Sequence, residues 1–512
     1  MRAVETVLAL VVLATVVAAS ARWLRAPAPS LLVAAGLVVG LLPGVPAVQV
    51  TPDVVGLIVL PPLLYAVAEE LPWRDLRAVL PPVTLLASGL VLASAAAVGL
   101  VAALVTPLPV SMAFLLGSVL ASTDPVAVTA LGRRLALPAR VHALVQGESL
   151  LNDATSLVLF RVAASIAVAG GSVSVGRSAA QFVLLAGGGV AVGAVVAGGI
   201  GLIRRRTEDP VLETVTALVT PYAAYVVAEG VHASGVTAVV VAGLILGSWA
   251  PRLTNASIRL QLHAVYGTVV FLLESVVFSL IGLELPVLIG ELSGERAWPL
   301  QALAVTGALL AIRILWVFPM SAALQYRRGT PLSWRIPAVV TWAGARGVVP
   351  LAAALSIPLV TDSGAPLPGR DLVLLITTSV IVITLLVQGF TLAPLVRRSG
   401  IAVASEAKDS EEAVARQRMA EAGLARLDQL VGAEAVPMAV ADRLRRELHT
   451  RIEHATAEEP AKAPLPYRDV RRKLIAVEGA ELARLHADGT VSDATRRRLQ
   501  RVLDLEDARL AE

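Results

Sequence analysis

The sequence contains no cysteine, which excludes disulfides, thiolate metal sites and thiol redox chemistry. Charged residues are also scarce: they make up 16% of the 512 residues, whereas soluble proteins contain about 25%. No lysine precedes Lys408, while hydrophobic residues account for 56% of the chain. This uneven distribution predicts a membrane domain over residues 1–398 and a cytoplasmic helical tail over residues 399–512.

Apolar runs long enough to cross a bilayer recur throughout the predicted membrane domain. A spanning helix needs about 17–25 apolar residues, and Arg, Pro and Gly breaks divide the runs into thirteen predicted spans. They cover 3–20, 28–44, 54–68, 80–105, 112–132, 142–169, 180–203, 212–228, 235–250, 264–285, 298–322, 336–357 and 371–396. We therefore expect an all-α, polytopic membrane protein with about 13 transmembrane helices.

The arginines indicate which side of the membrane each loop faces. With thirteen spans, seventeen arginines fall on the side of the tail, and four (Arg2, Arg177, Arg296 and Arg370) fall on the other. Positively charged loops favour the cytoplasm. The sequence therefore predicts an external N-terminus and a cytoplasmic tail in an inner or plasma membrane, with lipid as its surroundings. Because the basic residues lie in these loops, no nucleic-acid partner is expected.

After Arg398 the sequence becomes charged and helix-favouring. Helical stretches are predicted near 405–431, 438–456, 467–487 and 492–510, with Ser492 and Asp493 as possible N-caps of the last. Large apolar residues are too few for a big core. We expect helical hairpins that serve in regulation, in dimer contact or only in solubility.

Polar residues gather in two neighbouring predicted spans, 112–132 and 142–169. The first contains Ser122-Thr-Asp-Pro125, and its proline removes an amide donor and clashes with the carbonyl four residues earlier. A helix broken at membrane depth is tolerated where it lines a cavity, and its freed carbonyls can coordinate a cation. In the second span, Ser149 and Asp153 are four residues apart and share one helix face, so Asp153 can face the break.

This set of oxygen ligands predicts a site for a hard monovalent cation. It combines carboxylates, hydroxyls and carbonyls and lacks the His and Cys ligands of transition metals. A buried carboxyl group that holds either a proton or a cation makes Asp153 the exchanging group of an antiporter, with no cofactor. Two structural alternatives stay open: Asp124 caps a half-helix, or Asp153 pairs with an arginine.

A second interrupted helix is predicted in the span 336–357, where Gly344, Gly347 and Pro350 surround Arg346. If two six-helix repeats of inverted topology make up the domain, the two broken helices occupy matching places and cross at the midplane. Arg346 needs a counter-ion near the bilayer centre. Glu148 is its predicted partner, in a structural ion pair.

Two further acidic residues have more than one possible role. Glu274 lies in the middle of its span and either lines the cation route or pairs with Arg313. Glu69 is at a predicted cytoplasmic helix end, where it forms a cation-attracting vestibule or a solvated terminus.

Three motifs resemble the signatures of bacterial sodium/proton antiporters of the monovalent cation:proton antiporter family, relatives of the animal sodium/proton exchangers. They are Ser122-Thr-Asp-Pro125, Gly147-Glu-Ser-Leu-Leu-Asn-Asp153 and Gly344-Ala-Arg-Gly347. The resemblance covers about residues 1–398. It implies a homodimer whose core domains carry Na+ past a fixed dimerisation domain, with a role in pH homeostasis.

The resemblance also implies roles for individual residues. Asp153 is the carboxylate that exchanges the proton, supported by Asn152. The implied Na+ ligands are Thr123, Asp124, Ser149 and Asp153. The pair Glu148 and Arg346 braces the two broken helices, and the Asn-Asp sequence implies electroneutral exchange of one Na+ or Li+ for one proton.

One position departs from the family pattern. Many relatives carry a glutamate directly after the aromatic residue that matches Tyr65, and this chain has Ala66. One carboxylate ligand is therefore missing or is replaced by Glu69 or Glu274. K+/H+ exchange becomes an alternative, and so does a membrane sensor that has lost transport.

Overall fold

The computed structural model describes most of the chain. The described ranges are 2–24, 27–43, 54–71, 73–124, 138–169, 175–207, 209–253, 256–292, 296–327, 329, 331–401, 405–433, 437–456, 465–488, 495–496, 499–500, 502–503 and 505–507. The chain forms two compact units, Met1–Ala402 and Val403–Glu512. Helices dominate both units, and in the described ranges the β contact is one isolated bridge between Val360 and Pro366. The all-α prediction is confirmed.

The first half of the larger unit is a series of apolar helices, two of which contain π-helical turns. They are α1 (Arg2–Leu24), α2 (Ala28–Gly40), η1 (Val54–Val59) leading into α3 (Leu60–Glu70), α4 (Trp73–Thr84) continuing through η2 (Leu85–Leu90) into α5 (Val91–Val105), α6 (Val110–Val119) and α8 (Ala139–Val168). These helices coincide in position with the first six predicted spans, except that residues 125–132 lie outside the described residues.

In the described residues, the second half contains eight helices, the longest of the unit among them. They are α9 (Val175–Arg204), α10 (Pro210–Gly230), α11 (Gly235–Leu253), α12 (Ala256–Glu291), α13 (Trp298–Arg327), the short pair α14 (Arg335–Trp342) and α15 (Val348–Leu355), and α16 (Arg370–Ser399). In the described part of the chain, seven helices are long and apolar enough to cross a membrane, and four more are apolar but shorter.

Burial of the side chains differs between α16, an inner helix, and α9, an outer one. Along α16, most side chains are buried, including the polar Thr377, Thr378 and Thr384. By contrast, α9 exposes large apolar side chains such as Leu184 and Val195. Exposed apolar surface of this extent is unfavourable in water and is expected of a helix that faces lipid.

Gly247 allows a close contact between helices α11 and α3. A Cβ atom added to Gly247 of α11 would lie 2.4 Å from the carbonyl oxygen of Glu69, at the end of α3. Any side chain at this position would therefore push the two helices apart. The contact holds the end of α3, and with it Glu69, against α11.

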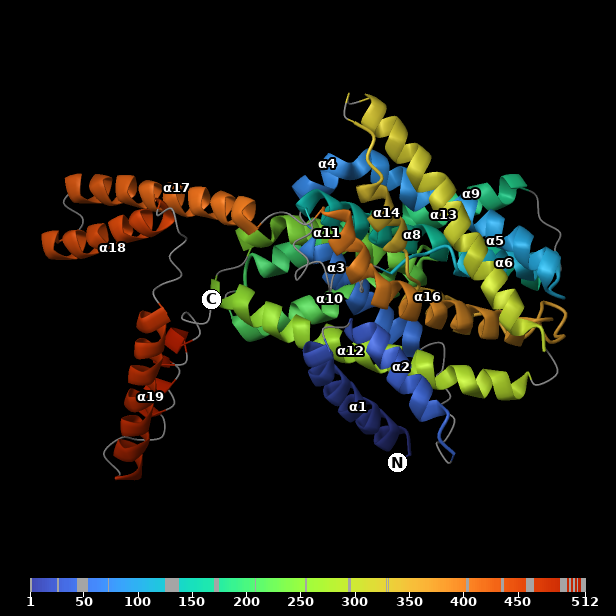
Figure 1. Cartoon of the computed structure of the whole chain (residues 1–512), viewed down its shortest axis with the longest axis horizontal. Coiled ribbons are helices and arrows are strands. Elements are labelled where there is room, and N and C mark those ends of the chain that lie inside the picture. Colours follow the sequence, from blue (N-terminus) through green and yellow to red (C-terminus); the bar gives the residue numbers. More distant parts are fainter. Residues whose placement is uncertain are drawn as a thin grey trace. The chain divides into compact units, whose positions relative to one another are not determined.

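The smaller unit is described by itself and contains α17 (Ser405–Gly432), α18 (Met438–Thr456) and α19 (Leu465–Ala487). Helices α17 and α18 form a hairpin (Figure 1), with an ion pair between Arg445 Nη2 and Asp428 Oδ1 at 2.8 Å. The predicted helix 492–510 is described only in part, and its proposed caps Ser492 and Asp493 lie outside the described residues.

Candidate cation site

The first element of the site is a chain segment that leaves helical geometry inside the membrane unit. Helix α6 ends at Val119, and residues Ser122 to Asp124 are non-helical. The steric conflict between a proline ring and the carbonyl four residues earlier gives a reason for an end before Ala121. Pro125 itself lies outside the described residues.

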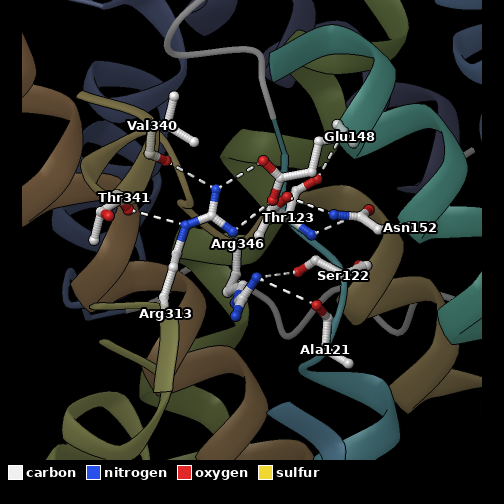
Figure 2. A network of polar contacts seen from close by, with 10 residues as sticks. Ala121, Ser122, Thr123, Glu148, Asn152, Arg313, Val340, Thr341 and Arg346 are labelled. Carbon is white, nitrogen blue, oxygen red and sulfur yellow. Dashed lines mark hydrogen bonds and ion pairs between the residues drawn. The ribbon is translucent and has the colours of Figure 1, made fainter. Parts of the chain in front are cut away.

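Helix α8 binds this segment through two polar side chains. Ser149 Oγ donates to the carbonyl oxygen of Thr123 at 2.7 Å. Asn152 Nδ2 donates to Thr123 Oγ1 at 2.6 Å, and the Thr123 amide donates to Asn152 Oδ1 at 3.4 Å (Figure 2). The structure thus brings Ser149, Asn152 and Thr123 together, and Asn152 holds the non-helical segment in place.

The break between α14 and α15 lies directly against the non-helical segment that follows α6. Residues 343–347 separate α14 from α15. The Asp124 amide donates to the carbonyl of Ala345 at 2.7 Å, and Asp124 Oδ2 accepts from the amide of Val348 at 3.3 Å. A carboxylate at a helix N-terminus is favoured by the helix dipole. The geometry therefore supports the capping role of Asp124, here toward α15.

Arg346 binds carbonyl groups of the segment that follows α6. Its Nη1 atom donates to the carbonyl oxygens of Ser122, at 2.6 Å, and Ala121, at 3.5 Å (Figure 2). Its amide donates to Thr384 Oγ1 of α16 at 3.1 Å. These carbonyls are left without intrahelical partners where α6 ends, so the buried guanidinium satisfies them and joins this segment to the break between α14 and α15.

The predicted ion pair between Glu148 and Arg346 is wrong, because Arg313 of α13 occupies the carboxylate of Glu148. Arg313 Nη1 lies 2.6 Å from Glu148 Oε1, and Nη2 lies 3.1 Å from Oε2. Arg313 also donates to the carbonyl oxygens of Thr341, at 3.0 Å, and Val340, at 2.9 Å. A guanidinium presents its donors in a fork that suits such bidentate binding. The brace of α8 is therefore α13, together with the end of α14 (Figure 2).

A cavity of about 650 Å³ lies beside these segments. Four predicted ligands line it: Thr123, Asp124, Ser149 and Asp153. Glu69 and Glu274 line it too, and no ion pair of Glu274 is found in the described ranges. Of the two roles open for Glu274, the geometry supports the one in the cavity wall, since Arg313 is bound to Glu148.

The mouth of the cavity lies at the end of α3, where the lining residues Glu70 and Arg259 are exposed. Glu70 at the end of α3, Ala250 near the end of α11 and Arg259 near the start of α12 all contribute to the lining. Because α3 and α11 end here and α12 begins here, these residues belong to the same surface of the unit. Arg204 also lines the cavity and is buried, whereas Arg205 and Arg206 are exposed. All three follow the predicted span 180–203, and hydropathy alone does not distinguish the buried arginine from the two exposed ones.

The chemistry of the site depends on Asp153, which is only 5% exposed. Its Oδ1 atom has no hydrogen-bond partner among the described residues. An uncompensated buried carboxylate is costly unless it binds a proton or a cation. Within the described ranges, no group of three or more His, Cys, Asp or Glu side chains is placed to hold a metal ion. The oxygens around the cavity suit a hard cation, which prefers oxygen ligands.

We expect Gly347→Ala to reduce activity at this site by at least about tenfold, since a displacement of about 1 Å can cost two orders of magnitude. A Cβ atom at Gly347 would lie 1.6 Å from Asp124 Oδ2, so the carboxylate must move away from the start of α15. The measurement is cation-driven proton flux in proteoliposomes. Gly307→Ala is the matched control, because its Cβ meets nothing within 4 Å. Equal activity of both variants would contradict the placement of Asp124.

Comparisons with known proteins match this arrangement to one family. Residues 8–398 match the model of the transmembrane sodium/hydrogen exchanger family. An uncharacterised Na+/H+ exchanger of Mycobacterium tuberculosis is 35% identical over 506 residues, which cover 95% of this chain and 92% of that protein. The Na+/H+ antiporter ApNhaP of Aphanothece halophytica is 33% identical over 401 residues, covering 76% and 73%.

The fold is also similar to that of a solved structure. The sodium/proton antiporter MjNhaP1 of Methanocaldococcus jannaschii superimposes with a TM-score of 0.61 at 21% identity. The match covers 78% of this chain and 99% of that one. At this identity the similarity supports the fold of the larger unit.

Proposed function

Since the chain belongs to the sodium/hydrogen exchanger family, we propose that it exchanges a cation for a proton at the carboxyl group of Asp153. Membership confirms the family inferred from the three sequence motifs, and it makes the chain a membrane antiporter and not an enzyme. The observation that carries the proposal is the buried carboxylate of Asp153 in a cavity wall, with one oxygen unbound among the described residues.

In the proposed cycle, the Asp153 carboxylate binds a cation from the cavity, releases it on the other side and returns with a proton. Binding of one species excludes the other, because both require the same carboxylate oxygens. Ser149 and Asp124 supply the neighbouring oxygens, and Asn152 keeps Thr123 in position through its two hydrogen bonds. The hydrogen bonds of Arg346 and Asp124 join the two interrupted helices, so that they move as one body.

We propose Na+ as the main cation, with Li+ as a second substrate and one proton exchanged per cation. The absence of a carboxylate at Ala66 leaves K+ as the alternative, since fewer charged ligands favour a less strongly hydrated ion. A sensor without transport is the remaining alternative. Na+ exchange, K+ exchange and a sensor without transport each predict a different result in the same flux assay.

The proposed architecture is the one that the sequence predicts. It has thirteen spans, arranged as two inverted six-helix repeats separated by the seventh span, an external N-terminus, a cytoplasmic C-terminal tail and a homodimer. The exposed apolar faces of α9 and α13 support contact with lipid or with a second copy. The cavity mouth then opens to the cytoplasm, because α3 and α11 end on the side of the tail in this topology.

The function is tested by proton flux in proteoliposomes that contain a pH dye. Pulses of Na+ or Li+ should change the internal pH, and K+ should act weakly or not at all. Electroneutral exchange predicts that the rate is unchanged when valinomycin and K+ impose a membrane potential. A rate that follows the potential would contradict one-for-one exchange, and a response to K+ alone would make the chain a K+/H+ antiporter. Lack of response to every cation in folded protein would favour the sensor.

A further inference from the structure

Three charged residues from different helices meet in the wall of the cavity, away from Asp153. Glu69 lies near the end of α3, Arg204 ends α9, and Glu213 lies in the first turn of α10. The side chains of Arg204 and Glu213 are fully buried, and that of Glu69 is 15% exposed. With all three groups ionised, the cluster carries one net negative charge.

Arg204 is bound to one of the two carboxylates much more closely than to the other. Its Nε atom donates to Glu213 Oε1, whereas its Nη1 atom lies 3.7 Å from Glu69 Oε1, beyond hydrogen-bond distance. Neither Nη atom has a hydrogen-bond partner in the described part of the chain. Glu213 therefore binds the arginine most closely, and Glu69 forms only a longer ion pair with it, which leaves lone pairs of the Glu69 carboxylate for another cation.

Glu69 also lies in the part of the cavity wall that is close to the mouth. Ala66 and Glu69 both line the cavity, and residues three apart lie on one helix face about 4.5 Å apart along the axis. Glu69 is the later residue, nearer the end of α3 and the cavity mouth. The close contact with Gly247 holds it there. A cation moving from the mouth toward Asp153 passes this carboxylate.

We propose that Glu69 is a transit site for the transported cation, kept available because Glu213 binds Arg204. A carboxylate in the wall replaces part of the hydration shell that the cation loses on entering an apolar cavity. Arg204 keeps the cation from binding too strongly to leave. This inference rests on the proposed antiport function, and it assigns to Arg204 and Glu213 a positioning role.

The first test is the apparent KM for Na+ of Glu69→Gln in proteoliposomes. We expect KM to rise by about fivefold or more, in line with the loss of one charge-assisted contact, while the rate at saturating Na+ is kept. Glu70→Gln is the matched control: its carboxylate also lines the cavity but is exposed. We expect its KM to change by less than about twofold, because exposed charges are screened.

The second test uses Glu213→Gln, which frees Arg204 to bind Glu69. We expect KM to rise as in Glu69→Gln, and we expect Glu213→Gln to add little in the Glu69→Gln background. Such non-additivity reports a direct coupling between the residues. A purely structural defect would lower the saturating rate or the amount of folded protein in both backgrounds.

Two results would overturn the transit site without touching the antiport function. One is a KM for Na+ in Glu69→Gln that equals the KM of the wild type. The other is an equal rise in Glu69→Gln and Glu70→Gln that disappears at high choline chloride, which would indicate general attraction at the mouth. Lack of Na+-driven exchange in the wild type would instead overturn both proposals.

Discussion

Replacing Asp153 by asparagine is expected to abolish cation-driven proton exchange, with a loss of at least about 100-fold, the usual scale for removing a proton-transfer group. Asparagine has nearly the same shape but can hold neither an exchangeable proton nor a cation's charge. The Asp153 residue is buried and its Oδ1 atom has no hydrogen bond among the described residues. The variant should therefore fold, and its thermal stability should be equal to or higher than that of the wild type.

The matched control is Asp371→Asn, an acid whose side chain is 68% exposed at the start of α16. It should keep wild-type exchange. The measurement is the initial rate of internal pH change after a Na+ pulse, normalised to the reconstituted protein. Exchange by Asp153→Asn at more than a tenth of the wild-type rate would place the exchanging carboxylate elsewhere, with Glu274 as the next candidate because it lines the same cavity.

Breaking the ion pair between Glu148 and Arg313 is expected to destabilise the membrane unit by about 3–5 kcal/mol, as for other buried pairs that lose one partner. In Glu148→Gln, the guanidinium of Arg313 stays buried beside Thr341 and Val340, whose carbonyls cannot neutralise it. The measurement is the midpoint of thermal unfolding in detergent, followed by the loss of the monodisperse size-exclusion peak. The midpoint should fall well below that of the wild type.

The double variant Glu148→Gln with Arg313→Gln should recover part of this loss, since no unpaired charge is left in the interior. Asp428→Asn breaks the exposed pair with Arg445 and should leave the midpoint unchanged. If Arg346→Gln instead recovered the stability lost in Glu148→Gln, the result would support the predicted pair of Glu148 with Arg346. It would then contradict the observed geometry.

The sequence by itself determined the features that depend on local spacing. Hydropathy placed the helices, because a membrane span needs a continuous apolar run whatever packs beside it. The proline rule placed an interruption near Asp124, and four-residue spacing put Ser149 and Asp153 on one face of α8. These rules act within one segment, so no knowledge of neighbouring helices was required.

Only the tertiary structure decided which charged groups meet. Two arginines, 165 and 198 residues farther along the chain, could have paired with Glu148, and helix packing placed Arg313 and not Arg346 against its carboxylate. The buried guanidinium of Arg346 donates to carbonyl oxygens that are free to accept a hydrogen bond only because α6 ends early. Likewise, Arg204 is buried beside Glu213 while the two following arginines are exposed. A charged side chain reaches several angstroms in any direction, so its partner is set by helix packing and not by distance along the chain.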